Sequence, residues 1–275
     1  MNPHAARSIS LFTLVNTLKT HRSLIYSLVK REVIGRYRGS IMGILWSFFN
    51  PVLMLIVYTF VFSVVFKARW AGGTDSRTEF ALVLFAGLMI YNLFSECINR
   101  SPGLILGNAN YVKKVVFPLE ILPIVALGSA LFHFLISFLV WLIFYLIFFG
   151  LPQATLLLFP LLLIPFLLLT LGFSWFLAAL GVFLRDVGQI VGVMMTALLF
   201  LSPIFYPITA LPAEYHLLLQ INPLTFVIEQ ARDVMIWGKG MNWQGWILYW
   251  ILAVLTAWMG FAWFQKTRKG FANVL

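Results

Sequence analysis

The chain has few charged residues for its length. Only 10% of its 275 residues are Asp, Glu, Lys or Arg, whereas 61% are hydrophobic. A soluble domain carries roughly 25% charged residues, which cover its surface. The deficit excludes a water-soluble fold and predicts an all-α integral membrane protein, because helices satisfy their own backbone groups in lipid.

The chain has too few cysteines and histidines for an internal disulfide or a metal site. Cys97 is the single cysteine, which excludes an internal disulfide and a cysteine metal cluster. The four histidines lack the spacing of metal ligands, so we expect no bound metal. His133 stands alone in an apolar segment and is expected to bond to a neighbour rather than relay protons. The N-terminus does not read as a cleaved signal peptide.

Motifs that would supply energy or catalysis are missing. There is no G-x-x-x-x-G-K-[ST] phosphate loop, and Gly238-Lys239-Gly240 is the nearest fragment. The apolar runs hold no chain of carboxylates of the kind that proton-driven pumps use. No clustered nucleophile or acid pair is visible, so we predict no enzyme activity. The chain should bind no cofactor and should depend on an outside source of energy.

Long apolar runs predict six membrane-spanning helices and a transmembrane domain over residues 39–275. The runs cover about residues 40–66, 80–98, two spans within 121–184, 188–205 and 243–264. Segment 121–184 has no charged residue and is too long for one span, so we predict a turn at Gly150-Leu151-Pro152-Gln153.

The first span carries two local signals. Gly39 and Gly43 have the spacing that lets a second helix approach closely. Asn50 followed by Pro51 predicts a kink, because proline removes a backbone hydrogen bond.

Residues 1–38 are predicted to form a cytoplasmic segment outside the spans. Apolar residues recur at helical spacing from about residue 9 to 33, interrupted by Lys19, Arg22, Lys30 and Arg31. Such a helix should lie in the headgroup plane with its apolar face toward the lipid. The alternative is a helix packed against soluble protein.

Residues 206–240 are predicted to form two short helices. Pro212 is placed in the first turn of one, and Asn222-Pro223 makes an N-cap and first-turn pair for the other, which stops at Gly238. Neither reaches the ~17 residues needed to cross the membrane. Because Glu229, Arg232 and Asp233 would each cost ~2.5 to 3.5 kcal/mol near the bilayer centre, both helices are expected to be partly inserted or on the surface.

The charge distribution predicts the orientation. The net charge is +10, and with six spans most of the 19 basic residues lie on the side of the termini. The positive-inside rule therefore places both termini in the cytoplasm. Basic residues at the ends of apolar runs indicate an anionic membrane surface rather than nucleic acid as the partner.

The segment 100–118, RSPGLILGNANYVKKVVFP, interrupts two apolar blocks. It carries Arg100, Lys113 and Lys114 and is bracketed by Pro102 and Pro118. It is too short and too mixed to span, so we predict that an external energy-supplying protein acts on it.

Three stretches resemble a known family: RYRGSIMGILWSFFNP, LSECINRSPGLILGNANYVKKVVFPLEILP, and FLRDVGQIVG with LSPIFYPITALP and INPLTFVIEQARD. They are similar to the membrane subunit of bacterial polysaccharide-exporting ABC transporters, over about residues 30–238. The resemblance implies a homodimer in the inner membrane, two copies of a cytoplasmic ATPase that uses ATP and Mg, and a lipid-linked polysaccharide as substrate. O-antigen is the preferred substrate, with capsule or teichoic acid as alternatives.

The resemblance also implies roles for particular residues. The coupling helix that docks in the ATPase would include Asn108, Asn110, Tyr111, Lys113, Lys114 and Pro118. Periplasmic gate helices would include Pro207, Pro212, Asn222, Pro223, Glu229 and Arg232. The alternative for segment 100–118 is an ordinary cytoplasmic loop.

Aromatic residues at helical spacing are candidates for a sugar-lined translocation pathway, since flat apolar rings with polar edges suit sugar faces. The predicted pathway residues are Asn50, Tyr58, Phe62, Phe134, Phe138, Trp141 and Tyr145. Aromatic residues also fill helix contacts and interface belts, and this alternative stays open for each ring.

Arg36, Tyr37 and Arg38 are predicted to receive the lipid phosphate at the cytoplasmic interface. The planar fork of arginine suits phosphate oxygens. The alternative is that both arginines anchor the chain to anionic lipid. Two other functions remain open: a drug or small-lipid exporter of the same architecture, and a membrane acyl- or glycosyltransferase.

Overall fold

The computed structural model describes residues 11–61, 70, 77–113 and 117–275, and within them the chain is helical with no strand. Among these described residues, five helical segments are long and apolar enough to cross a membrane: Gly43–Val61, Thr78–Gly103, Leu119–Phe149, Ala154–Phe183 and Trp243–Val274. The apolar helix at the place of the predicted fifth span, Val187–Leu201, has only 15 residues. Six spans therefore stay a prediction.

Among the described residues, α-helices alternate with short 3-10 turns at several of the connections. The α-helices are α1 (Leu11–Thr20), α2 (Arg22–Tyr37), α3 (Trp46–Tyr58), α4 (Arg77–Arg100), α5 (Ala109–Lys113), α6 (Leu122–Phe149), α7 (Phe159–Phe183), α8 (Val187–Leu201), α9 (His216–Ile221), α10 (Pro223–Met235), α11 (Trp243–Thr267) and α12 (Phe271–Val274). The 3-10 turns are η1 (Gly43–Leu45), η3 (Ser101–Gly103), η4 (Leu106–Asn108), η5 (Leu119–Ile121), η6 (Ala154–Leu158), η7 (Ile208–Ala210), η8 (Ala213–Tyr215) and η9 (Arg268–Gly270).

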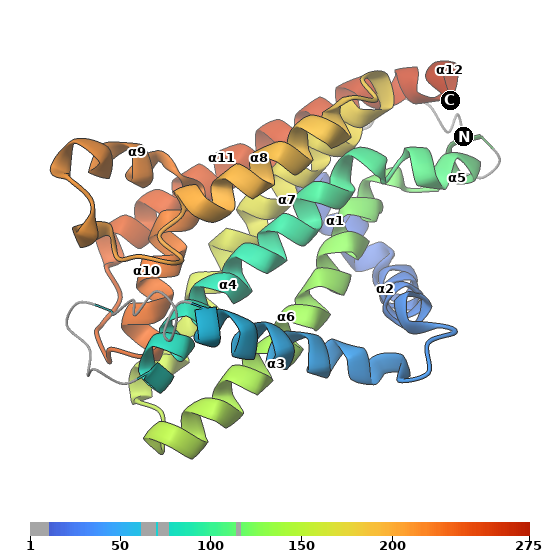
Figure 1. Cartoon of the computed structure of the whole chain (residues 1–275). Helices are drawn as coiled ribbons and strands as arrows, with labels where there is room; N and C mark the ends of the chain where they lie inside the picture. The colour runs from blue at the N-terminus through green and yellow to red at the C-terminus, as the bar shows by residue number, and fades with distance from the viewer. Residues whose placement is uncertain (1–10, 62–69, 71–76, 114–116) are drawn as a thin grey trace.

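The bundle has two distinct ends (Figure 1). Helices α5 and α12 and the C-terminus lie together at one end, here called the α5 end. Helices α9 and α10 lie at the opposite end, here called the α10 end. The long helices α4, α6, α7 and α11 join the two ends, and α7 and α11 share the most extensive helix contact.

Small residues set the α7–α11 contact. A Cβ added at Gly172 would lie 2.6 Å from the backbone of Thr256, and one at Gly260 would overlap the backbone of Gly172. In lipid, close backbone approach of this kind favours helix association because dispersion contacts accumulate along the seam.

The predicted turn between the third and fourth spans is confirmed. Helix α6 ends at Phe149, and Gly150 follows with φ +78°. That left-handed conformation is available to glycine without steric cost, so the chain can reverse there.

The glycine pair before the first span has a different role from the predicted one. Gly39 and Gly43 have φ values of +85° and +52°, and no atom lies within 4 Å of a Cβ added at either. They form turns between α2 and α3 rather than a helix-packing surface. Pro51 lies inside α3, as predicted.

The N-terminal amphipathic helix is divided. Instead of one helix ending near residue 33, the chain forms α1 and α2 with a break at His21, and α2 continues to Tyr37. The apolar face of α2 packs on α6, where Gly128 would meet the Val29 side chain at 2.7 Å if it carried a Cβ. Its predicted position in the headgroup plane stays a prediction.

Helix α10 packs inside the bundle, and its predicted position, partly inserted or on the membrane surface, stays a prediction. Asn222 caps it as predicted, accepting a hydrogen bond at Oδ1 from the backbone N of Leu224 (3.0 Å), and Gly238 has φ +63°. The helix packs against α4 and α7, with most of its residues shielded from solvent. Pro212 precedes the turn η8 rather than lying within it.

Candidate functional site: a polar cleft beside a network of ion pairs

A polar cleft opens between α3, α4 and α6. Its volume is about 670 Å³, and the end of α2 closes one side of it. Its lining residues are Arg36, Tyr37, Trp46, Ser47, Asn50, Pro51, Met54, Tyr58, Phe85, Leu88, Met89, Asn92, Ser95, Glu96, Asn99, His133 and Ser137. This set joins residues that the sequence assigned to two functions, the phosphate site and the translocation pathway.

Helix α4 supplies a polar stripe to this cleft. Asn92, Ser95, Glu96 and Asn99 have the spacing of one helix face. They line the cleft, while the intervening Leu93, Phe94 and Cys97 are buried in the core. The spacing is present in the sequence, but three of the four residues are uncharged, so a pattern of clustered carboxylates does not reveal it.

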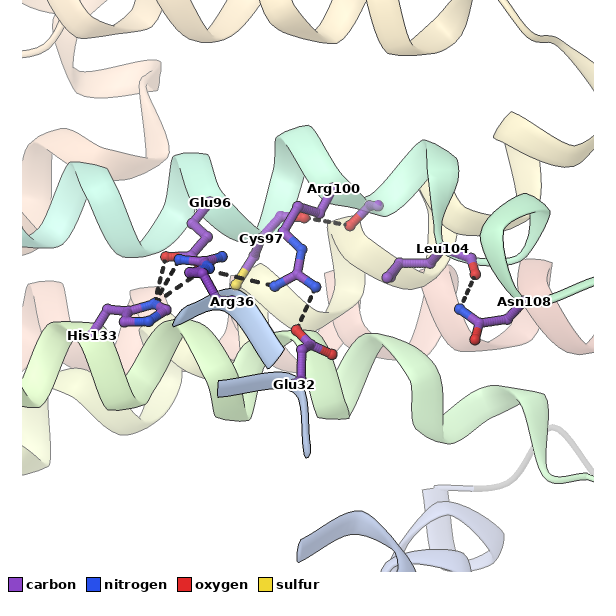
Figure 2. A network of polar contacts seen from close by, with 9 residues as sticks. Glu32, Arg36, Glu96, Cys97, Arg100, Leu104, Asn108 and His133 are labelled. Carbon is purple, nitrogen blue, oxygen red and sulfur yellow. Dashed lines mark hydrogen bonds and ion pairs between the residues drawn. The ribbon is translucent and has the colours of Figure 1, made fainter. Parts of the chain in front are cut away.

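Glu96 is the centre of the charged part of the lining (Figure 2). Its Oε1 lies 2.5 Å from Nη2 of Arg36, and both of its oxygens lie 3.2 Å from Nδ1 of His133. Nη1 of Arg36 lies 3.0 Å from the same His133 nitrogen. The prediction that His133 bonds to a neighbour is confirmed, and its partners come from α2 and α4.

Arg100 extends the network along α4. Its guanidinium pairs with Glu32 of α2 and lies 3.7 Å from Oε1 of Glu96. Glu32, Arg36, Glu96 and Arg100 thus form a chain of alternating charge that joins α2 to α4 (Figure 2). Because two arginines balance two carboxylates, this group has no net charge when His133 is neutral.

The same edge of α2 reaches the predicted coupling segment. Nη2 of Arg31 donates a hydrogen bond to the hydroxyl of Tyr111 in α5 (3.1 Å). The Tyr111 ring stacks on Phe117 with centroids 4.3 Å apart. Helix α2 therefore contacts both the cleft lining and α5.

The other coupling residues are spread along the chain from η4 to Pro118. Nδ2 of Asn108 donates to the carbonyl oxygen of Leu104 (2.9 Å), Asn110 is exposed, and Pro118 is buried. Lys113 ends α5. Lys114 lies outside the described residues.

The predicted phosphate residues separate into two places. Arg36 and Tyr37 line the polar cleft, whereas Arg38 lines a second hollow of about 380 Å³. Its lining residues are Ser27, Lys30, Arg31, Ile34, Gly35 and Arg38. We call this hollow the basic groove, since its lining has three cations and no carboxylate.

The predicted aromatic pathway lies mostly in the packed interior. Phe134, Trp141 and Tyr145 are buried, and Nε1 of Trp141 donates to the carbonyl oxygen of Leu82 (3.1 Å). Phe138 stacks on Trp141, with centroids 6.0 Å apart. These rings make helix contacts in the structure, and their predicted part in a translocation pathway stays a prediction. Asn50 and Tyr58 line the cleft, and Phe62 lies outside the described residues.

Arg232 is the most connected of the predicted gate residues. Its guanidinium donates to the carbonyl oxygens of Val83 (3.1 Å), Pro203 (2.5 Å) and Ile204 (2.8 Å). It also pairs with Glu229 (3.1 Å) and lies 4.2 Å from the ring centroid of Trp70. Burial lowers the pKa of Arg232 to about 10, so it stays protonated at neutral pH.

Two other gate residues lie in or contact the segment that follows α8. Pro207 precedes η7, and Nδ2 of Asn222 donates to Oγ of Ser202 (2.8 Å). Burial also raises the pKa of Glu229, against the opposing effect of Arg232. The side chains of Arg232 and Asn222 therefore both hold the chain that follows α8.

Among the described residues, no group of three or more His, Cys, Asp or Glu side chains could hold a metal ion. The chemistry that the cleft offers is hydrogen bonding from amides and hydroxyls beside aromatic rings.

Comparison with known sequences supplies independent information. A family profile described as "ABC-2 type transporter" matches residues 23–236. This stretch includes α2, the cleft, the coupling segment and α10.

Curated relatives cover almost the whole chain. An "O-antigen export system permease protein RfbA" of Myxococcus xanthus is 28% identical over 265 residues, or 96% of this chain and 99% of that protein. An RfbA of Klebsiella pneumoniae is 25% identical and covers 92% of this chain and 95% of the relative. The "Polysialic acid transport protein KpsM" of Escherichia coli is 25% identical over 78% of this chain and 81% of the relative.

Proposed function

Because the chain belongs to the ABC-2 type transporter family, we propose that it is the membrane subunit of an ATP-driven exporter that moves a lipid-linked polysaccharide from the cytoplasm to the periplasm. The names of the relatives support a polysaccharide substrate, with O-antigen first and a capsule polymer as the alternative that the likeness to KpsM favours. The structural observation that carries the proposal is the position of α2. It contacts the polar cleft through Arg36 and the coupling segment through Arg31.

Energy is supplied by a partner in this proposal. The chain has no phosphate-loop motif, and we assign ATP and Mg to two copies of a separate cytoplasmic ATPase that docks on α5. Exposed Asn110 and the stacked Tyr111 would meet the ATPase. The subunit itself would work as a homodimer without a cofactor of its own.

The proposed orientation follows the charge distribution. The α5 end would face the cytoplasm with both termini, and the α10 end would face the periplasm with the gate residues, α8 being the fifth of six spans. Lys239 and Asp233 would then lie on the outer side.

The lipid phosphate would bind at the basic groove. Arg38, Arg31 and Lys30 line it without a carboxylate, whereas Arg36 is already paired with Glu96. Of the three predicted phosphate residues, only Arg38 is retained in this assignment. Arg36 and Tyr37 are assigned to the cleft instead. Guanidinium groups suit phosphate oxygens because of their fork of donors.

The test is reconstitution of the purified chain with its ATPase in liposomes that contain the glycan-bearing lipid. We expect ATP-dependent appearance of the glycan on the opposite leaflet, measured by its accessibility to an added glycosidase. Liposomes without ATPase or with a non-hydrolysable ATP analogue are the controls. ATP hydrolysis by the chain alone, or export of a small amphiphilic dye in place of the glycan lipid, would contradict the proposal.

A further inference from the structure

The polar stripe on α4 lies in a span that is otherwise apolar and packed. The side chains of Asn92 and Asn99 are exposed to the cleft, and Asn50 of α3 faces the same space. Polar side chains are costly within a membrane and mark substrate pathways when they face a water-filled cavity. The stripe therefore needs a function beyond helix packing.

The amides of the cleft have unused hydrogen-bonding capacity. Among the described residues, neither Asn50 nor Asn92 forms a side-chain hydrogen bond with another residue. Asn99 uses one donor, from Nδ2 to Oγ of Ser95 (2.9 Å). Each amide offers both a donor and an acceptor, which matches a ligand that carries many hydroxyl groups.

The charge of the cleft does not match phosphate. Arg36 is paired with Glu96, and both side chains line the cleft. Because Glu96 balances Arg36 in the lining, the cleft offers a phosphate no excess of positive charge. The basic groove, by contrast, has Lys30, Arg31 and Arg38 and no acidic lining residue.

Ring faces complete the lining. Trp46, Tyr37 and Tyr58 contribute aromatic surface beside the amides. Aromatic faces bind the apolar faces of sugar rings while polar groups bind their hydroxyls. The volume of about 670 Å³ falls within the roughly 300–1,000 Å³ typical of small-molecule sites.

We infer that the polar cleft is a binding site for uncharged sugar units of the transported glycan and does not bind its phosphate. Asn92 and Asn99 of α4 and Asn50 of α3 bind sugar hydroxyls, and Trp46 lies against a ring face. The inference rests on the proposed function and divides the substrate between two sites, with sugar in the cleft and lipid phosphate in the basic groove.

The experiment compares three probes on the reconstituted complex of this chain with its ATPase. They are the glycan-bearing undecaprenyl pyrophosphate isolated from cells that synthesise it, undecaprenyl pyrophosphate without sugar, and the glycan released from the lipid by mild acid. The variants are Asn92→Leu, Asn99→Leu and the double variant. Gln220→Leu, which removes an exposed amide from α9, is the matched control.

The measured quantity is the probe concentration that gives half-maximal stimulation of ATP hydrolysis. We expect the double variant to raise this half-maximal concentration about tenfold for the glycan-bearing lipid, which corresponds to 1.4 kcal/mol. The value for the sugar-free lipid should stay unchanged. The released glycan should compete with the glycan-bearing lipid in the wild type and compete less well in the double variant.

Two results would overturn the inference. An equal shift for the sugar-free lipid would assign the cleft to phosphate. An unchanged value for the glycan-bearing lipid, with export by the wild type intact, would remove the sugar from the cleft but leave the proposed function standing. Failure of the proposed function is distinguishable, because the wild type would then export no glycan lipid.

A photo-crosslinking experiment tests the site even if the asparagine variants fail to insert into the membrane. A benzophenone amino acid at Met54, a cleft residue, should capture the glycan-bearing lipid in otherwise unaltered protein. The same group at Ile251, exposed on α11, should not. Equal capture at both positions would contradict the site.

Discussion

The ion pairs that join α2 to α4 and the contacts of Arg232 in α10 differ in their exposure to solvent. Toward the α5 end, Glu32–Arg100 and Arg36–Glu96 are ion pairs whose side chains are 20–39% exposed. At the α10 end, the Arg232 side chain is 2% exposed and is surrounded by backbone carbonyls. A partly solvated pair costs little to separate, whereas a buried guanidinium cannot leave its acceptors cheaply. The α2–α4 pairs are therefore suited to rearrangement and the Arg232 contacts to fixing one arrangement.

The largest effect is expected at Arg232. Arg232→Met should destabilise the protein by about 3–5 kcal/mol, because it leaves Glu229 and the carbonyl oxygens of Val83, Pro203 and Ile204 without their donor. The measurement is thermal unfolding in detergent together with the amount of protein in the membrane. Lys239→Gln is the control, since the Lys239 side chain is 69% exposed in its pair with Asp233. Equal stability of the two variants would contradict a fixed α10 end.

The Arg268–Glu120 pair lies at the α5 end but is buried like Arg232, so it tests the effect of burial separately from position in the bundle. Nη1 of Arg268 lies 2.6 Å from Oε2 of Glu120, with side chains 5% and 1% exposed, and Nη2 donates to the carbonyl oxygen of Phe117 (3.1 Å). Arg268→Gln should cost about 3 kcal/mol, because the buried Glu120 carboxylate loses the charge-assisted hydrogen bond from this guanidinium. The double variant with Glu120→Gln should recover part of this loss in the same unfolding measurement. If the double variant were the less stable one, charge compensation would not explain the pair.

Changes to the partly exposed Glu32–Arg100 pair should affect function more than stability. Glu32→Arg or Arg100→Glu alone should change stability by about 0–1 kcal/mol and lower the stimulation of ATP hydrolysis by glycan-bearing lipid several-fold. The reason is that like charges would separate α2 from α4. Exchanging both residues restores opposite charges and should restore stimulation. If ATP hydrolysis were stimulated to the wild-type level in both single variants, this pair would not couple the binding of the glycan-bearing lipid to ATP hydrolysis.

The smallest effect on the protein is expected from single cysteine substitutions that test which end is cytoplasmic. In a Cys97→Ser background, Lys239→Cys and Lys269→Cys place exposed thiols at the α10 and α5 ends. An impermeant thiol reagent should label position 239 in cells with a permeabilised outer membrane, and position 269 only after lysis. The reverse pattern would invert the proposed orientation. Function should be retained in both variants, because neither lysine is buried.

Much of the helical framework was predictable because its signals are local. The uncharged run 121–184 with Gly150 predicted the α6–α7 hairpin, and Asn222-Pro223 predicted the start of α10. Each signal acts over a few residues, through the left-handed φ of glycine or an N-cap hydrogen bond. The break at His21, where no side chain caps the start of α2, was not predicted.

The candidate site was only partly predictable. The sequence assigned Arg36 to the phosphate site and Asn50 and Tyr58 to the pathway, whereas the structure places all three in the lining of one cleft. The rings of Phe134, Trp141 and Tyr145 have the same helical spacing whether they face a pathway or a neighbouring helix, so periodicity could not distinguish the two.

Composition and local patterning thus determined the membrane class, most helix positions and the polar interruption at 100–118, since these depend on neighbours in the chain. The tertiary structure decided how charge is compensated. Glu96 meets Arg36 across 60 positions, and Arg232 meets the carbonyl of Val83 across 149. Whether a charged side chain in an apolar segment is costly, structural or free for a ligand depends on these distant partners, because burial and pairing together set its electrostatic energy.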